Sequence, residues 1–111
     1  MMQDATALEV ARARHRGDTV IDVWTLQEFV SGHVPGAQFI PLAIVPLRLS
    51  DIDRRSPVYV VCESGGRGSQ ASRYLDQHGY TVMNLSGGMV EWRAAGLSIE
   101  TGHDPHVGAV A

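Results

Sequence analysis

The chain has 111 residues, a length that fits one domain with its own hydrophobic core. Its formal net charge of -3 at pH 7 argues against nucleic-acid binding, because nucleic-acid binders usually carry a basic face. The single cysteine excludes an internal disulfide framework, and no apolar run suits a signal peptide or a bilayer-spanning helix. We therefore expect a soluble cytoplasmic protein that contacts neither nucleic acid nor membrane.

The first half of the chain predicts two helices and two strands. Small and apolar residues at helical spacing over 4–14 favour a first helix that stops near Gly17. The β-branched run at 19–24 is typical of a buried strand, and 25–32 of a short helix with Thr25 as N-cap. The prolines and glycine of 33–42 indicate a turn that leads to a short strand around 38–40. We expect at most one helical turn in 43–56.

The second half predicts two further strands, each followed by a helix. The apolar run at 57–62 and the segment 80–85 read as strands, and 69–79 and 87–96 as helices. Strands that alternate with helices over short connections indicate an α/β domain with a mostly parallel sheet. We expect this single domain to cover 1–102 and the last residues, 103–111, to form a flexible tail.

The lone cysteine lies where such sheets bind ligands, at the carboxyl end of the most buried strand. Glycines after it allow the backbone to turn its N–H groups inward, and the helix expected from about Ser69 would favour an anion there. This setting suits a nucleophilic thiolate or the persulfide made from it. The alternative is a small buried hydrophobe before a tight turn. The candidate site is Cys62 followed by Glu63, Ser64, Gly65, Gly66, Arg67 and Gly68.

Two charged side chains in this loop have opposite expected roles. Arg67, five residues after the cysteine, is within reach of an anion bound over the sulfur. Glu63 would oppose a thiolate if it pointed inward, and we expect it to point outward to the solvent-exposed rim.

Several separate motifs resemble the rhodanese family, specifically a single stand-alone domain. They are "IDVW" followed by "EF", then "GHVPGAQFIPL", "VVCESGGRGS" and "GYTVMNLSGGMVEWRAAGLSIE". The resemblance implies a central five-stranded parallel sheet flanked by helices, in three layers. It also implies sulfur transfer through a cysteine persulfide without metal or organic cofactor. Cys62 would accept the sulfur, the backbone from Glu63 to Gly68 would surround it, and Arg67 would help to hold the anionic donor.

The chain departs from the usual family pattern at three positions. Trp24 stands where arginine is common, so that Asp22 is expected to find backbone donors or another arginine. Glu63 replaces a basic or neutral residue. Gly68 replaces a serine, and Ser69 is expected to cap the helix instead.

The resulting hypothesis is a sulfurtransferase that moves sulfane sulfur from a small anionic donor such as thiosulfate to cyanide, a thiol or a protein acceptor. The alternative is a persulfide carrier or interaction module with little turnover of small donors. A third possibility, a phosphatase or arsenate reductase, is disfavoured because the related phosphatases place arginine six residues after the cysteine. His33 is expected to brace a turn, and a metal site at His103 and His106 lacks a third ligand.

Overall fold

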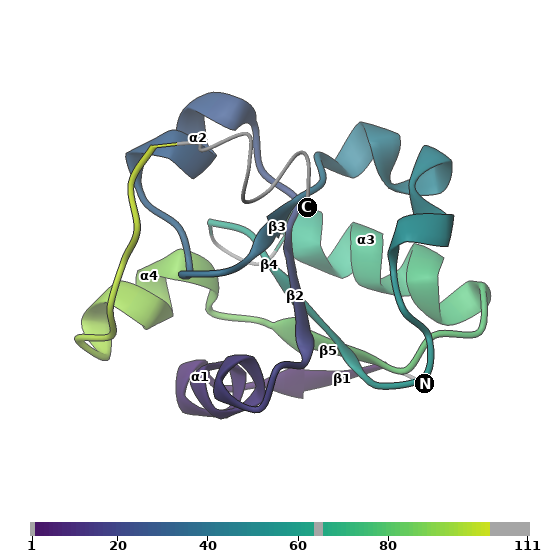
Figure 1. Cartoon of the computed structure of the whole chain (residues 1–111), viewed down its shortest axis with the longest axis horizontal. Coiled ribbons are helices and arrows are strands. Elements are labelled where there is room, and N and C mark those ends of the chain that lie inside the picture. Colours follow the sequence, from purple (N-terminus) through teal and green to yellow (C-terminus); the bar gives the residue numbers. More distant parts are fainter. Residues whose placement is uncertain (1, 64–65, 103–111) are drawn as a thin grey trace.

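The computed structural model describes residues 2–63 and 66–102. Within them, one five-stranded sheet has the order β1-β5-β4-β2-β3, and every pairing is parallel (Figure 1). The strand that precedes Cys62, β4, is therefore central, with β5 on one side and β2 on the other. The strands are β1 (Met2–Ala5), β2 (Thr19–Asp22), β3 (Gln38–Phe39), β4 (Val58–Val61) and β5 (Val82–Leu85).

Helices cover both faces of this sheet, which gives three layers (Figure 1). On one face, α1 (Ala7–His15) packs beside α4 (Gly88–Ala94). On the other, α3 (Gly66–Gln77) contacts β4 and β5 and the 3-10 helix η1 (Leu42–Leu47), which is followed by η2 (Leu49–Asp51). The short helix α2 (Leu26–Ser31) follows β2 and contacts β3 through the rings of Phe29 and Phe39.

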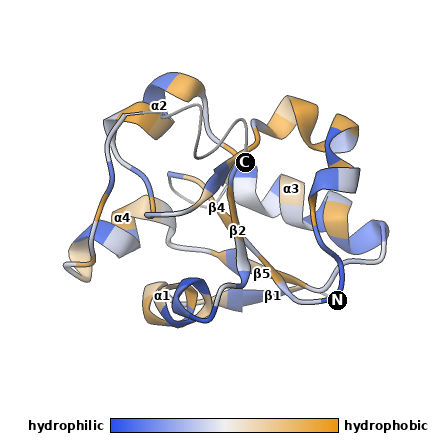
Figure 2. Cartoon of the chain, viewed as in Figure 1, coloured by the Kyte–Doolittle hydropathy of each residue, from blue (hydrophilic) through white to orange (hydrophobic). Residues whose placement is uncertain are grey.

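The burial of each strand agrees with its position in the sheet. All four residues of β4 are buried, as expected for a parallel strand covered on both faces. Figure 2 shows apolar residues along the central strands β2 and β4, whereas the edge strand β1 is largely hydrophilic. Both tryptophans, Trp24 and Trp92, are fully buried in the same core. None of the described helices is long and apolar enough to cross a bilayer.

The α/β class and the parallel sheet expected from the sequence are confirmed, as are the Thr25 cap and the short strand at 38–40. The expected helix over 4–14 was wrong at its start, because Met2–Ala5 form an edge strand. This strand pairs with β5, Met2 lying opposite Val82. The helix begins only after Thr6, whose side chain forms a capping box with Glu9.

Candidate functional site

Cys62 follows β4 directly, at the carboxyl edge of the sheet, and is 1% exposed. Its sulfur accepts a hydrogen bond from the backbone N–H of Gly68 at 3.2 Å, in the first turn of α3. The expected helix start near Ser69 was therefore three residues too late, since α3 begins at Gly66. The earlier start aims the amide-rich, positive end of α3 at the sulfur, which stabilises negative charge there.

The first residues of α4 hold the same segment from the other side. The N–H groups of Met89 and Val90 donate to the carbonyl oxygens of Cys62 and Glu63, at 2.9 and 3.2 Å. Gly88 precedes them with φ at +59°, and a side chain there would collide with the Glu63 carbonyl. The sulfur-bearing residue is thus fixed by main-chain contacts to two helices.

Gly68 is needed for close approach and not for an unusual backbone angle. Gly66 and Gly68 lie in α3, and neither has a positive φ. A Cβ atom on Gly68 would lie 2.6 Å from Oδ1 of Asn84 and 3.4 Å from the sulfur of Cys62. The Asn84 side chain, 2% exposed on β5, occupies the space that a side chain at position 68 would need.

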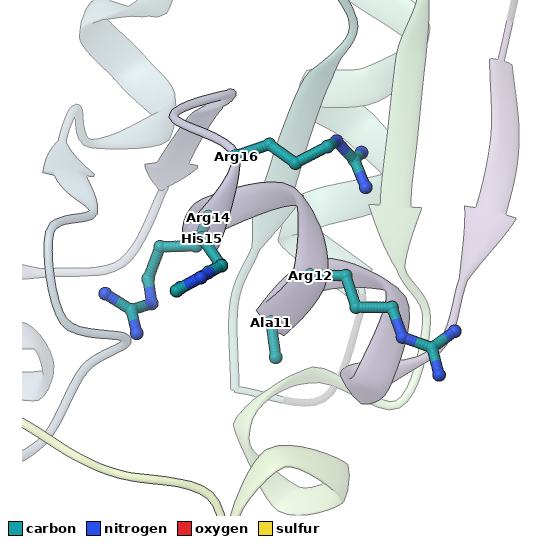
Figure 3. A pocket seen from close by; sticks show the side chains of 5 residues that line it. All are labelled: Ala11, Arg12, Arg14, His15 and Arg16. Atoms are coloured by element: carbon teal, nitrogen blue, oxygen red, sulfur yellow. The ribbon is translucent and has the colours of Figure 1, made fainter.

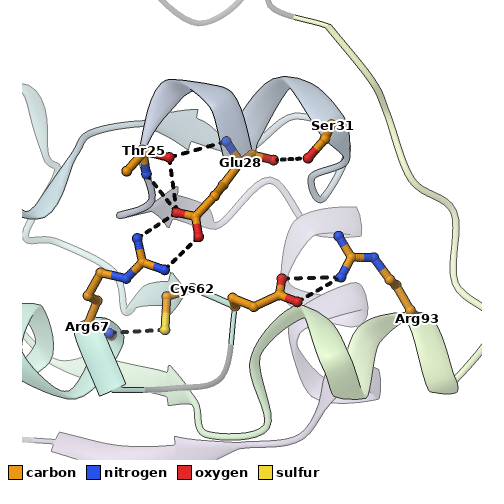
Figure 4. Close-up of polar contacts among 8 residues, drawn as sticks. Thr25, Glu28, Ser31, Cys62, Arg67 and Arg93 are labelled. Carbon is orange, nitrogen blue, oxygen red and sulfur yellow. Dashed lines mark hydrogen bonds and ion pairs between the residues drawn. The ribbon is translucent and has the colours of Figure 1, made fainter.

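Arg67 is engaged by a carboxylate from α2 (Figure 4). Its Nη1 and Nη2 atoms donate to Oε1 and Oε2 of Glu28 at 2.6 and 2.8 Å, a bidentate pair. The hydrogen bonds from Arg67 are the main reason that the pKa of Glu28 is lowered to about 2. The pKa of Arg67 is raised, first by its hydrogen bonds to Glu28 and also by the charge of Cys62. The arginine thus lies in the electrostatic field of the thiol and already has an anionic partner.

Glu63 points away from the sulfur, as expected. Its carboxylate pairs with Arg93 of α4, with both Nη1–Oε distances at 3.2 Å and both side chains about two-fifths exposed (Figure 4 shows Arg93). Arg67, in the first turn of α3, and Arg93, the partner of Glu63, are therefore each paired with a glutamate.

The partners expected for Asp22, the Trp24 backbone N–H and the charge of Arg67, compensate its burial only in part. Its side chain is fully buried at the end of β2, and neither carboxylate oxygen has a hydrogen-bond partner in the described structure. Burial raises the pKa of Asp22 to about 8, with the charge of Glu28 adding to the rise, while the Trp24 backbone N–H and Arg67 oppose it. No arginine among the described residues forms an ion pair with Asp22, and its raised pKa favours the protonated carboxyl.

His33 braces a turn, as expected. Its Nδ1 lies 2.7 Å from the carbonyl oxygen of Phe29, and its ring stacks on the Phe29 ring at 3.7 Å. Its backbone forms an antiparallel bridge with Glu100. Four residues that the sequence singled out, Ser64, Gly65, His103 and His106, lie outside the described residues.

A surface pocket elsewhere involves none of the candidate residues. It lies on the second half of α1 (Figure 3). Basic side chains are common at helix C-termini, where they complement the helix dipole. The pocket is lined by Ala11, Arg12, Arg14, His15 and Arg16.

Sequence reasoning missed two residues of this site. Glu28 was given no role at the site, although its place three residues after Thr25 marks a capping box. Asn84 carried one signal, a polar residue inside an otherwise apolar strand run.

The chain is thus an α/β domain with a cysteine at the carboxyl edge of its parallel sheet, where a backbone N–H of a helix donates to the sulfur. Such a donor stabilises negative charge on the sulfur. A family model for the rhodanese-like domain matches residues 6–95, and the chain belongs to this family.

Among curated proteins, the chain is 36% identical over 97 residues to a sulfurtransferase of Allochromatium vinosum, covering 86% of this chain and 91% of that protein. It is 32% identical over 87 residues to the thiosulfate sulfurtransferase GlpE of Pseudomonas aeruginosa, covering 78% and 79%. Among solved structures, a rhodanese-related protein from Thermoplasma volcanium superposes with a TM-score of 0.80 at 23% identity, covering 87% and 96%. This last likeness shows the fold alone.

Proposed function

We propose that this domain transfers sulfane sulfur through a persulfide on Cys62. The donor is a small anionic sulfur compound such as thiosulfate, and the acceptor is cyanide, a thiol or a protein. The observation that carries the proposal is the contact between the Gly68 N–H and the Cys62 sulfur at 3.2 Å. A preformed amide donor at the helix start is suited to stabilising negative charge on an attacking sulfur and on the persulfide formed from it.

The chemistry has two balanced steps. The Cys62 thiolate attacks the outer sulfur of thiosulfate, a new S–S bond forms, and the old S–S bond breaks with its electron pair leaving on sulfite. The acceptor nucleophile then attacks the outer sulfur of the Cys62 persulfide, and the thiolate is restored. The candidate site supplies the nucleophile and main-chain donors near it, and the sequence of steps needs no metal or organic cofactor.

The test is the intact mass of the protein after incubation with thiosulfate, beside the Cys62→Ala variant. We expect the wild type alone to gain one sulfur atom and to lose it again with cyanide, which becomes thiocyanate. A gain of equal size on the variant would refute the assignment of Cys62.

The paired state of the arginines favours one alternative, a persulfide carrier that turns over small donors poorly. Glu28 and Glu63 neutralise Arg67 and Arg93, so that a free thiosulfate ion meets little net positive charge. Fast loading from a persulfidated protein, with negligible thiosulfate turnover in the same preparation, would support the carrier. Comparable rates with both donors would refute it.

A further inference from the structure

We infer that Glu28 selects the sulfur donor: by filling the guanidinium fork of Arg67, it makes an organic persulfide a better donor to Cys62 than thiosulfate. This inference rests on the proposed sulfur transfer at Cys62 and adds to it the chemical class of the donor. It makes Glu28 a specificity residue that acts through Arg67.

The Glu28 carboxylate is positioned before any donor arrives. Its Oε1 accepts hydrogen bonds from the backbone N–H and the hydroxyl of Thr25, at 3.0 and 3.2 Å, as part of the α2 cap. The same oxygen accepts from Arg67 Nη1, while Oε2 accepts from Nη2 (Figure 4). A side chain held by both a helix cap and a bidentate partner stays in place as a fixed internal counter-ion.

Thiosulfate would have to compete with this counter-ion. It is a dianion whose sulfonate oxygens match the fork that the Glu28 carboxylate already occupies. Displacing Glu28 would give up two short charge-assisted hydrogen bonds and leave a carboxylate facing the donor. The second arginine, Arg93, offers no substitute because Glu63 occupies it.

An organic persulfide avoids this competition. It has no sulfonate group and carries at most one charge on its sulfur pair, which the amide over Cys62 can accommodate. The Cys62 thiolate attacks the outer sulfur of R–S–SH, so that Cys62–S–SH forms and R–S⁻ leaves with the electron pair of the broken bond. The proton stays on the outer sulfur, and no further oxidant or reductant is needed.

Glu28→Gln is the variant that tests this assignment. Glutamine keeps the shape of the side chain and still serves in a capping box, but it removes the negative charge from Arg67. The matched control is Glu9→Gln, which makes the same chemical change in the capping box of α1, where Thr6 is the partner. Both variants are measured with thiosulfate and with glutathione persulfide as donors, and kcat and KM are determined separately.

In the wild type we expect kcat/KM to be higher for glutathione persulfide than for thiosulfate. In Glu28→Gln we expect kcat/KM for thiosulfate to rise about tenfold through a lower KM, with the persulfide value changing by less than about threefold. A general structural effect would instead change both donors alike and would act through kcat.

Two results would overturn the inference. One is a ratio of kcat/KM for thiosulfate to kcat/KM for the persulfide that is the same in Glu28→Gln, Glu9→Gln and the wild type. The other is a wild type with a higher kcat/KM for thiosulfate than for the persulfide. The wild-type comparison stands even if Glu28→Gln fails to fold. Failure of the proposed function looks different: neither donor would then load sulfur on Cys62 in any of the proteins, and both proposals would fall.

Discussion

Replacing Asp22 with asparagine should change how the stability of the domain depends on pH. Burial raises the pKa of this carboxyl from 3.8 to about 8, and neither oxygen has a hydrogen-bond partner in the described structure. Between these two values, the unfolded chain loses the Asp22 proton while the folded domain retains it. The unfolded state thus binds fewer protons, and stability falls as the pH rises.

The size of this effect follows from the pKa difference. Each pH unit between the two values costs about 1.4 kcal/mol of unfolding free energy. The penalty is absent below about pH 4, grows through the neutral range and levels off above about pH 8, with an upper limit of roughly 5–6 kcal/mol. Asparagine has nearly the shape of the neutral acid and cannot ionise. The stability difference between Asp22→Asn and the wild type should therefore be small in acid and increase with pH.

Urea unfolding followed by tryptophan fluorescence measures this difference, since both tryptophans are buried. The midpoints are compared at several values between pH 4.5 and 8.5, and subtracting the two proteins at each pH removes all titrations that they share. Asp53→Asn serves as a control whose effect does not change with pH in this range. Hydrogen bonds from Arg55 lower the pKa of Asp53 below 3.8, so its carboxylate is charged in both the folded and the unfolded state from pH 4.5 to 8.5. A difference for Asp22→Asn that stays level with pH would refute the reasoning.

Two glycines at the site give the remaining predictions. Gly68→Ala places a methyl group 2.6 Å from Asn84 Oδ1, so we expect a loss of about 1–3 kcal/mol in stability and a marked fall in persulfide formation, measured by urea unfolding and intact mass. An unchanged stability and persulfide yield would show that the close approach of Gly68 to Asn84 and Cys62 is not needed. In Gly88→Ala the alanine must adopt φ near +59° and its methyl group meets the Glu63 carbonyl. We expect the free energy of unfolding to fall by at least about 1–2 kcal/mol and kcat to be lower. A variant as stable as the wild type would contradict the close contact.

The sequence predicted those parts of the fold whose signals are local. The apolar run of β4, the Thr25 cap and the helical pattern of α3 each depend on neighbouring residues, and each was confirmed. The sequence did not predict β1, because Gln3 and Asp4 are exposed at the sheet edge and show no strand pattern. The hydrogen bonds of β1 come from β5, which is far away in the sequence. The start of α3 was predicted too late, because Gly66 and Gly68 suggest a loop when their contacts in the fold are unknown.

The position of Cys62 at the candidate site could be predicted from the sequence, but the pairing of charged residues around it could not. Cys62 could be recognised from its place after a buried strand and before a glycine-rich segment. The pairing of Arg67 with Glu28 joins residues 39 positions apart, and no spacing rule predicts it. The lack of a partner for Asp22 is likewise a property of the assembled core.

The pairing of β1 with β5 has a consequence for the order in which the domain assembles during synthesis. Met2 lies opposite Val82, so the first strand of this sheet to be translated has no partner until β5, the last strand of the sheet, has been translated. β2 and β4 can pair earlier, which brings Cys62 to the end of its strand before the main-chain clamp from Met89 and Val90 exists. Domains dominated by such distant pairings fold slowly. Cys62 is thus translated well before the α4 residues that hold it. The growing chain passes through a stage in which this cysteine is not yet enclosed by α4.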